Sequence, residues 1–171
     1  MNKIKNLIIS AIGSDKPGIV SMLSGIINRH GGNIEESRMT VLGSDFVVIM
    51  LLSVDTNWEE SLLVSLESVR ELSISIKETS SKRIIKEDFF NIELNGADNE
   101  GIIDVLSNYL VENSMNIQDM DTNISNAPVT GTPLFNLRAI VEKTKNINLM
   151  EVEKDLNSLG NKLGVEIKVL D

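Results

Sequence analysis

Asp15-Lys16-Pro17-Gly18 is the stretch that decides the fold of this chain. The apolar segment Leu7–Gly13 before it favours a strand, and residues 19–27 after it are apolar at helical spacing. We expect Asp15 to cap the helix with its carboxylate and Pro17 to lie in the first turn. Gly18 lacks a Cβ, so another group could approach its backbone N–H. A strand, tight turn and helix start of this kind present free N–H groups and the positive end of the helix dipole, which suit an anion.

The same stretch returns 83 positions later. The recurring positions include two glycines, an aspartate and a post-helix asparagine: Gly13, Asp15, Gly18 and Asn33 correspond to Gly96, Asp98, Gly101 and Asn116. The apolar helical positions follow the same offset. One constant offset over this much sequence indicates a tandem duplication.

Each repeat predicts the element order βαββαβ. In the first repeat, strands are expected over 4–12, 33–42, 46–54 and 74–77, with helices over 17–29 and 58–72. In the second, the last helix and strand are expected over 148–163 and 165–169. This order is the ferredoxin-like arrangement of the α+β class, an antiparallel sheet with both helices on one face. The predicted domains are residues 1–79 and 88–171, joined by a linker over 80–87.

One insertion breaks the constant offset. Phe46 aligns with Phe135, a shift of 89, so six residues have been added between the second and third strands of the second repeat. The added loop, residues 125–133, contains two prolines and a glycine. Such a loop can be an ordered excursion or a mobile flap.

Composition narrows the possible functions. The 171 residues include no Cys, carry a formal net charge of −9 and are 42% hydrophobic. No apolar run reaches the roughly 18 residues that a membrane span needs, and no signal-peptide pattern is visible, so we expect a cytoplasmic protein. The acidic surface argues against nucleic acid as a direct partner.

The acidic charge is concentrated in the second repeat. Residues 1–85 hold 9 basic and 10 acidic residues, whereas residues 86–171 hold 7 and 15. This asymmetry fits two modules with different neighbours. It fits equally well a second module that is simply more solvated.

The sequence offers little catalytic chemistry. His30 is the single histidine, and its place on the apolar helix face predicts a partly buried packing residue. A metal site lacks a second histidine, and no serine has a base as a candidate partner. We therefore expect neither an enzyme nor a metal or cofactor site. RNA binding on the sheet would need exposed aromatics and basic flanks, and the strand over 46–54 offers Phe46 alone.

The remaining candidate site is the Asp15–Gly18 turn together with Asn33-Ile34. Backbone N–H groups would bind a carboxylate, Asp15 an ammonium, and Asn33 would supply further hydrogen bonds. These are the groups that recognise a free amino acid. The same residues also fit a purely structural role, in which they form the start of a helix and the turn after it and bind no ligand.

Asp15-Lys16-Pro17-Gly18-Ile19-Val20, followed by Gly31-Gly32-Asn33-Ile34, resembles the signature of ACT domains, which are βαββαβ modules that bind amino acids and regulate metabolism. A chain of two such modules resembles the glycine cleavage system transcriptional repressor family. The resemblance implies that the ligand lies between modules, with the turn from one and the post-helix residues from its neighbour. The implied ligand-binding residues are Asp15, Pro17, Gly18, Ile19, Asn33 and Ile34 in the first module and Asp98, Gly101, Asn116 and Ile117 in the second.

The resemblance also implies a function. It implies a non-catalytic sensor of a small, glycine- or serine-like amino acid, acting through a protein partner that regulates transcription. Nucleic acid and membrane are not expected as direct partners. Asn99-Glu100 replaces Lys16-Pro17 and adds a carboxylate, so we expect the ligand mainly at the Asp15 turn.

A homodimer is expected because modules this small leave edge strands and Ile/Val-rich faces uncovered. Two other functions stay open. The chain could be a regulatory portion related to formyltetrahydrofolate deformylase, a hydrolase, or an assembly module that binds no ligand.

Overall fold

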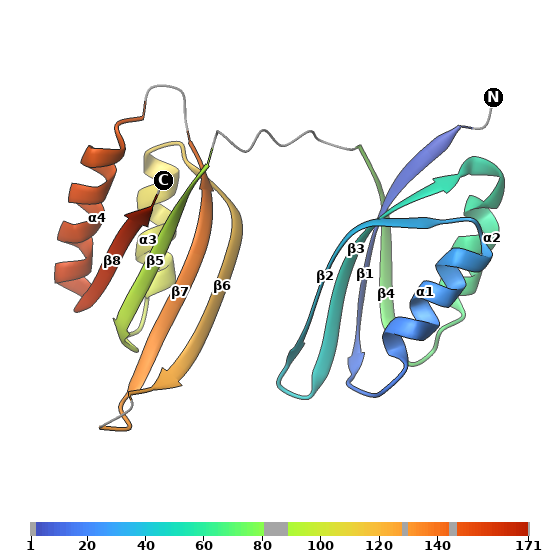
Figure 1. Cartoon of the computed structure of the whole chain (residues 1–171), viewed down its shortest axis with the longest axis horizontal. Coiled ribbons are helices and arrows are strands. Elements are labelled where there is room, and N and C mark those ends of the chain that lie inside the picture. The colour runs from blue at the N-terminus through green and yellow to red at the C-terminus, as the bar shows by residue number, and fades with distance from the viewer. Residues whose placement is uncertain (1–2, 81–88, 128–129, 144–146, 171) are drawn as a thin grey trace. The chain divides into compact units, whose positions relative to one another are not determined.

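The computed structural model describes residues 3–80, 89–127, 130–143 and 147–170. The chain divides into two compact units, Met1–Arg83 and Ile84–Asp171, each with its own sheet and two helices (Figure 1). We call them the first and second modules. The predicted linker, residues 80–87, lies outside the described residues except for Ser80.

Both modules have the element order that the sequence predicts. The first contains β1 (Ile4–Ser14), α1 (Ile19–Arg29), β2 (Asn33–Leu42), β3 (Asp45–Asp55), α2 (Thr56–Glu67) and β4 (Ser73–Thr79). The second contains β5 (Phe89–Ala97), α3 (Ile102–Glu112), β6 (Asn116–Asn126), β7 (Pro133–Glu142), α4 (Leu149–Leu163) and β8 (Val165–Leu170). The antiparallel sheets have the orders β2-β3-β1-β4 and β6-β7-β5-β8, which confirms the ferredoxin-like α+β fold.

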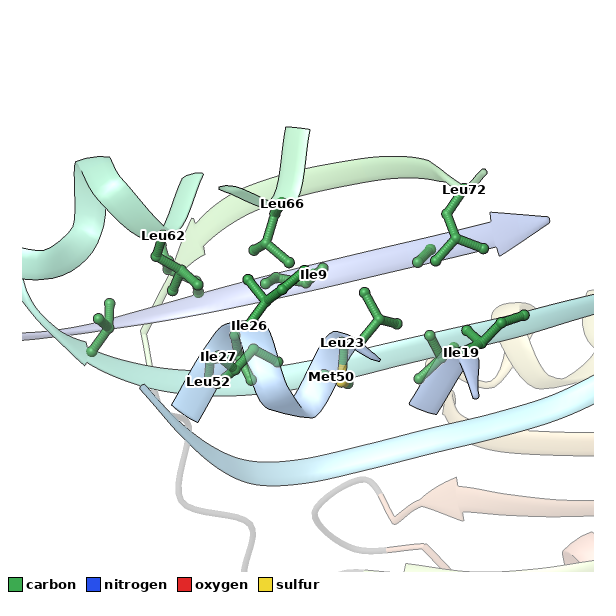
Figure 2. Close-up of a cluster of buried hydrophobic side chains, with 14 of the residues drawn as sticks. Ile9, Ile19, Leu23, Ile26, Ile27, Met50, Leu52, Leu62, Leu66 and Leu72 are labelled. Carbon is green, nitrogen blue, oxygen red and sulfur yellow. The ribbon is translucent and has the colours of Figure 1, made fainter. Parts of the chain in front are cut away.

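The helices of the first module cover one face of its sheet. Alternate residues of β1 and β3, such as Ile9 and Leu52, point to that face and are fully buried. Leu23 and Ile27 of α1 and Leu66 of α2 pack against them in one cluster (Figure 2). The second module has an equivalent, separate cluster. The other face of each sheet is left without helices.

The start of α1 differs from the prediction. Gly18 has φ 96° and is the N-cap, so the helix begins at Ile19 and Pro17 precedes its first turn. No side chain caps α1, so the predicted cap by Asp15 is wrong. A Cβ on Gly18 would meet nothing within 4 Å, so the positive φ, rather than a close approach, favours glycine here. Gly101 begins α3 in the same way, with φ 82°.

The end of α2 also differs from the prediction. The helix stops at Glu67, five residues early, and its end tightens into an i→i−3 turn in which Val69 N–H donates to Leu66 O at 3.1 Å. Asp55 caps its start, accepting a hydrogen bond from Asn57 N–H at 2.9 Å. His30 is partly buried against α2, with Ser61 Oγ 3.0 Å from Nδ1 and Ser65 Oγ 2.9 Å from Nε2.

The second strand of each module contains a β-bulge that the sequence analysis did not predict. Ile34 lies opposite Leu52 and Glu36 opposite Leu51, so Glu35 is the extra residue. In β6 the register shifts in the same way between Ile117 and Asp119.

The strand registers confirm the insertion. Val41 faces Phe46 in the first module, and Ile124 faces Phe135 in the second, which reproduces the change of offset from 83 to 89. Part of the added segment extends the hairpin, because Asn126 pairs with Pro133. Residues 128–129, at its centre, lie outside the described residues.

Candidate functional site

An open pocket of about 640 Å³ lies along the turn between β1 and α1. We call it the turn pocket. Its lining residues come from the turn, the first turns of α1 and the start of β3: Asp15, Lys16, Pro17, Gly18, Ile19, Val20, Ser21, Ser24 and Phe46. Four of the predicted ligand-binding residues, Asp15, Pro17, Gly18 and Ile19, therefore lie together.

The helix start supplies hydrogen-bond donors to this pocket. The first helical hydrogen bond runs from Met22 N–H to Gly18 O at 2.8 Å. The N–H groups of Ile19, Val20 and Ser21 consequently have no acceptor within the helix. The first turn of α1 contains no acidic residue, so the positive end of the helix dipole is not neutralised there. The arrangement suits a carboxylate or another small anion.

The turn is held in place from both sides. Asp15 N–H donates to Ser44 O at 3.0 Å, which fixes the backbone against the β2–β3 hairpin. Lys16 Nζ lies 2.5 Å from Glu71 Oε2, in the segment before β4. The pairing of Lys16 with Glu71 leaves the exposed carboxylate of Asp15 as the negative group of the pocket.

Asn33 and Ile34 are not part of this pocket. Ser14 pairs with Asp45 and Asn33 with Ser53, so the two ends of the predicted site are eight β3 residues apart, roughly 27 Å. Asn33 Nδ2 instead donates to Glu35 Oε1 at 2.9 Å. One module therefore brings together the turn residues and leaves the post-helix residues at the far end of α1.

Glu35 accepts a second hydrogen bond at the same oxygen. Ser53 Oγ donates to Glu35 Oε1 at 2.5 Å. The hydrogen bond from Ser53, followed by that from Asn33, lowers the pKa of the Glu35 carboxyl. The Asn33 amide thus belongs to a small network around the bulge rather than to the turn pocket.

The second module repeats this geometry with different side chains. Asp98 and Gly101 lie at the turn before α3, whereas Asn116 and Ile117 lie at the start of β6, again at the opposite end. Asn99, which replaces Lys16, donates its side-chain amide to Leu163 O at 2.9 Å. Asp104, in the first turn of α3, replaces Ser21 of the first module.

The sequence analysis missed several residues of the turn pocket. Ser21, Ser24 and Phe46 line it, yet none was predicted. A signal for the two serines existed, because Ser21 follows Gly18 by three positions and Ser24 follows Ser21 by three, so each lies one helical turn beyond the previous one. Phe46 reaches the pocket only through the pairing of β3 with β1, which places it opposite Gly13.

Residues 3–80, 89–127, 130–143 and 147–170 lack two further kinds of feature. No helix in these segments is long and apolar enough to cross a membrane. The same segments contain no cluster of three or more His, Cys, Asp or Glu residues that could hold a metal ion.

Comparison with known proteins relates these features to a family. A profile of the ACT domain matches residues 5–79. The glycine cleavage system transcriptional repressor of Escherichia coli (strain K12) is 38% identical over 81 residues, which are 44% of this chain and 42% of the repressor. The chain therefore matches less than half of that relative's length.

Two other related proteins are matched over almost their whole length. A UPF0237 protein of Clostridium perfringens (strain 13 / Type A) is 30% identical over 88 residues, which are 50% of this chain and 93% of that protein. The crystal structure of an unknown protein from Galdieria sulphuraria covers 98% of both chains at 28% identity, with a TM-score of 0.83. The first module of the chain belongs to the ACT-domain family, the second module repeats its strand order, and part of the chain is related to the glycine cleavage system transcriptional repressor.

Proposed function

We propose that this protein is a non-catalytic regulatory protein that senses a small, glycine- or serine-like amino acid at the turn pocket of the first module. One observation carries the proposal: the N–H groups at the start of α1 and the Asp15 carboxylate line one pocket. The α-carboxylate of the ligand would accept hydrogen bonds from the N–H groups of Ile19–Ser21, and its ammonium would pair with Asp15.

The second module is a poorer site for the same ligand. Glu100 lies in its turn and Asp104 in the first turn of α3, where the first module has Pro17 and Ser21. Both carboxylates would repel the carboxylate of an amino acid and would compete with it for the helix N-terminus. We therefore propose that the two turns bind unequally.

The regulatory output would pass through another protein. The relation to a transcriptional repressor and the net charge of −9 support a protein partner, a transcription regulator in the cytoplasm, over direct contact with nucleic acid. In the arrangement implied by the ACT resemblance, Asn33 and Ile34 reach the ligand from a neighbouring module. Their distance from the turn pocket of their own module is consistent with that role.

Ligand binding can be tested in two steps. A thermal-shift screen of the twenty amino acids identifies a ligand, since only a compound that binds the folded state raises the melting temperature. Calorimetric titration of that ligand into Asp15→Ala and Asp98→Ala then compares the two turns. Asp15→Ala should lose about 1.5–3 kcal/mol of binding free energy, because a charge-assisted hydrogen bond disappears.

Asp98→Ala is the matched control and should cost clearly less. Neither aspartate caps its helix, so both variants should melt close to the wild-type temperature. Equal affinity losses at the two positions would reject the unequal sites. A screen in which no amino acid raises the melting temperature would reject amino-acid sensing and favour a ligand-free assembly module.

A further inference from the structure

The uncovered face of the first sheet carries a contiguous apolar patch. Its members are side chains of the two central strands that point away from the helices: Ile8, Ile12, Val47, Ile49 and Leu51. Ile49 is 52% exposed, Ile12 47% and Ile8 37%. Scattered apolar residues on a surface are ordinary, but a continuous patch at the centre of a sheet marks an interaction surface.

The second module shows that the fold does not require this patch. The five equivalent positions on its uncovered face are mostly polar: Asn91, Asn95, Asn136, Arg138 and Ile140. These polar side chains bond to one another and their neighbours. Asn95 Nδ2 donates to Asn136 Oδ1, Asn136 Nδ2 donates to Asn123 Oδ1 at 3.1 Å, and Arg138 Nε lies 3.4 Å from Glu93. The uncovered face of the second module is thus hydrophilic, whereas the equivalent face of the first module is apolar.

The register of the first sheet arranges its uncovered face in cross-strand rows. One row runs Glu36–Leu51–Ile8–Lys77 across β2, β3, β1 and β4. It has an acid at one edge of the sheet, a base at the other and two apolar residues between them. A hollow of about 290 Å³ lies along this row, lined partly by Ile8, Ile49 and Leu51. Arg38 lies in the middle row, next to Ile49, and its Nη1 lies 2.9 Å from Oε1 of Glu36 in the same strand.

We propose that a second copy of this chain covers the patch, face to face, with the two-fold axis parallel to the strands. Such a rotation places β2 of one copy over β4 of the other. Glu36 then faces Lys77 of the partner subunit, and Leu51 faces Ile8 of the partner subunit, so the row is complementary to itself. Side chains of the two faces would interdigitate at the usual sheet separation of about 10 Å.

The charges select this axis over the alternative. A two-fold axis perpendicular to the strands would place β2 over β2, and when it crosses the middle row it brings Arg38 against Arg38 of the partner subunit. Each Arg38 is paired with Glu36 of its own strand, with Arg38 Nη1 2.9 Å from Glu36 Oε1, so this arrangement sets two like ion pairs against each other and gains no acid–base complementarity. The middle row of the second module contains Asp121, Arg138, Glu93 and Lys168, and covering it would remove four charges from water. The apolar first module is therefore the face that a second copy covers.

The intact chain tests the proposal by sedimentation velocity across the micromolar range. The wild type should dimerise. Ile49→Glu buries a carboxylate at the centre of the interface in each copy, so its dissociation constant should rise about a hundredfold or more. Ile140→Glu makes the same change on the uncovered face of the second module and should leave the dissociation constant unchanged. Far-ultraviolet circular dichroism checks that both variants are folded.

A charge swap tests the orientation. Glu36→Lys and Lys77→Glu should each weaken the dimer about threefold to tenfold, because two rim ion pairs become repulsive. The double variant restores opposite charges across the interface and should recover most of the wild-type affinity. A monomeric wild type would overturn the proposal. So would equal effects of Ile49→Glu and Ile140→Glu, or a double variant as weak as the singles. Because the dimer needs no ligand, a failed ligand screen leaves it standing.

Discussion

At the scale of single residues, Glu35 shows how a bulge creates a local network. Its pKa is lowered mainly by the hydrogen bond from Ser53 and further by that from Asn33. Ser53→Ala should therefore raise the pKa of Glu35 part of the way to its ordinary value near 4.5. An NMR titration of the side-chain carboxyl measures this change.

The lowered pKa also fixes the sign of the pH dependence. A depressed carboxyl pKa stabilises the fold at pH values above the ordinary pKa, and the contribution is lost as the pH falls through the lowered pKa. The wild type should be more stable than Ser53→Ala near neutral pH, and this difference in the free energy of unfolding should disappear in acid, below about pH 4.5. Ser24→Ala removes an exposed hydroxyl that donates to Ser21 O, and it should leave the titration of Glu35 unchanged.

Gly18 shows what residue-level reasoning can and cannot find. The sequence identified the position, and the structure places Gly18 in the turn pocket. The expected reason was a close approach, whereas the observed reason is the positive φ. Local sequence does not separate the two reasons, because glycine serves both. The bulge at Glu35 had no signal at all, since it arises from the pairing of β2 with β3.

At the scale of elements, α1 and α3 begin differently from α2 and α4. Asp55 caps α2 and Asn148 caps α4 with side-chain oxygens, whereas α1 and α3 begin at glycines without a side-chain cap. Asp55→Ala and Asn148→Ala should each lower the free energy of unfolding by about 1 kcal/mol. Asp15→Ala should change it by less than about 0.5 kcal/mol, as expected for a surface substitution.

Urea unfolding followed by circular dichroism compares these variants on equal terms. A loss at Asp15→Ala as large as that at Asp55→Ala would show that Asp15 supports the start of α1 after all. It would also weaken the use of Asp15→Ala as a clean test of ligand binding.

Most element boundaries followed from the sequence because periodicity and turn residues agree. β2 and β8 start where predicted, and the Gly43 turn joins β2 to β3. The largest miss fell at a helix end, where single residues decide, and β1 and β4 each end two residues beyond the prediction. Pro17 favours an early start of α1 but Gly18 delays it, and apolar spacing continues to Val69 although α2 has already ended.

At the scale of the whole molecule, the net charge of −9 predicts a negative result with duplex DNA. A protein with 16 basic and 25 acidic residues offers little surface to neutralise phosphates. No micromolar complex should form in a gel-shift assay at about 150 mM salt. A retarded band that weakens as salt rises would contradict this expectation and would point to a basic surface within the acidic chain.

A single strand does not show that the uncovered sheet face is apolar in the first module and polar in the second. Ile8 and Ile12 belong to a continuous apolar segment, which predicts the strand over 4–12 but not which side chains face the helices. The register places them beside Leu51 and Val47 on the face without helices. The replacement of Ile12 by Asn95 under the 83-residue offset was the available signal.

The two modules have separate hydrophobic clusters, which predicts separate responses to core damage. Leu66 in α2 and Leu156 in α4 hold equivalent places, and each is 0% exposed. Truncation of either leucine to alanine should cost about 2–5 kcal/mol within its own module, because the transfer energy is lost and a cavity remains.

Hydrogen exchange measured by mass spectrometry resolves the two modules within the intact chain. Leu66→Ala should speed exchange in β1 and leave β5 unchanged, whereas Leu156→Ala should do the reverse. Each variant is the other's control, since the substitution and the burial are the same. If either variant sped exchange equally in β1 and β5, the two clusters would unfold as one cooperative unit. A reciprocal pattern would instead mean that each module holds its own stability, so that binding at one turn need not reshape the other.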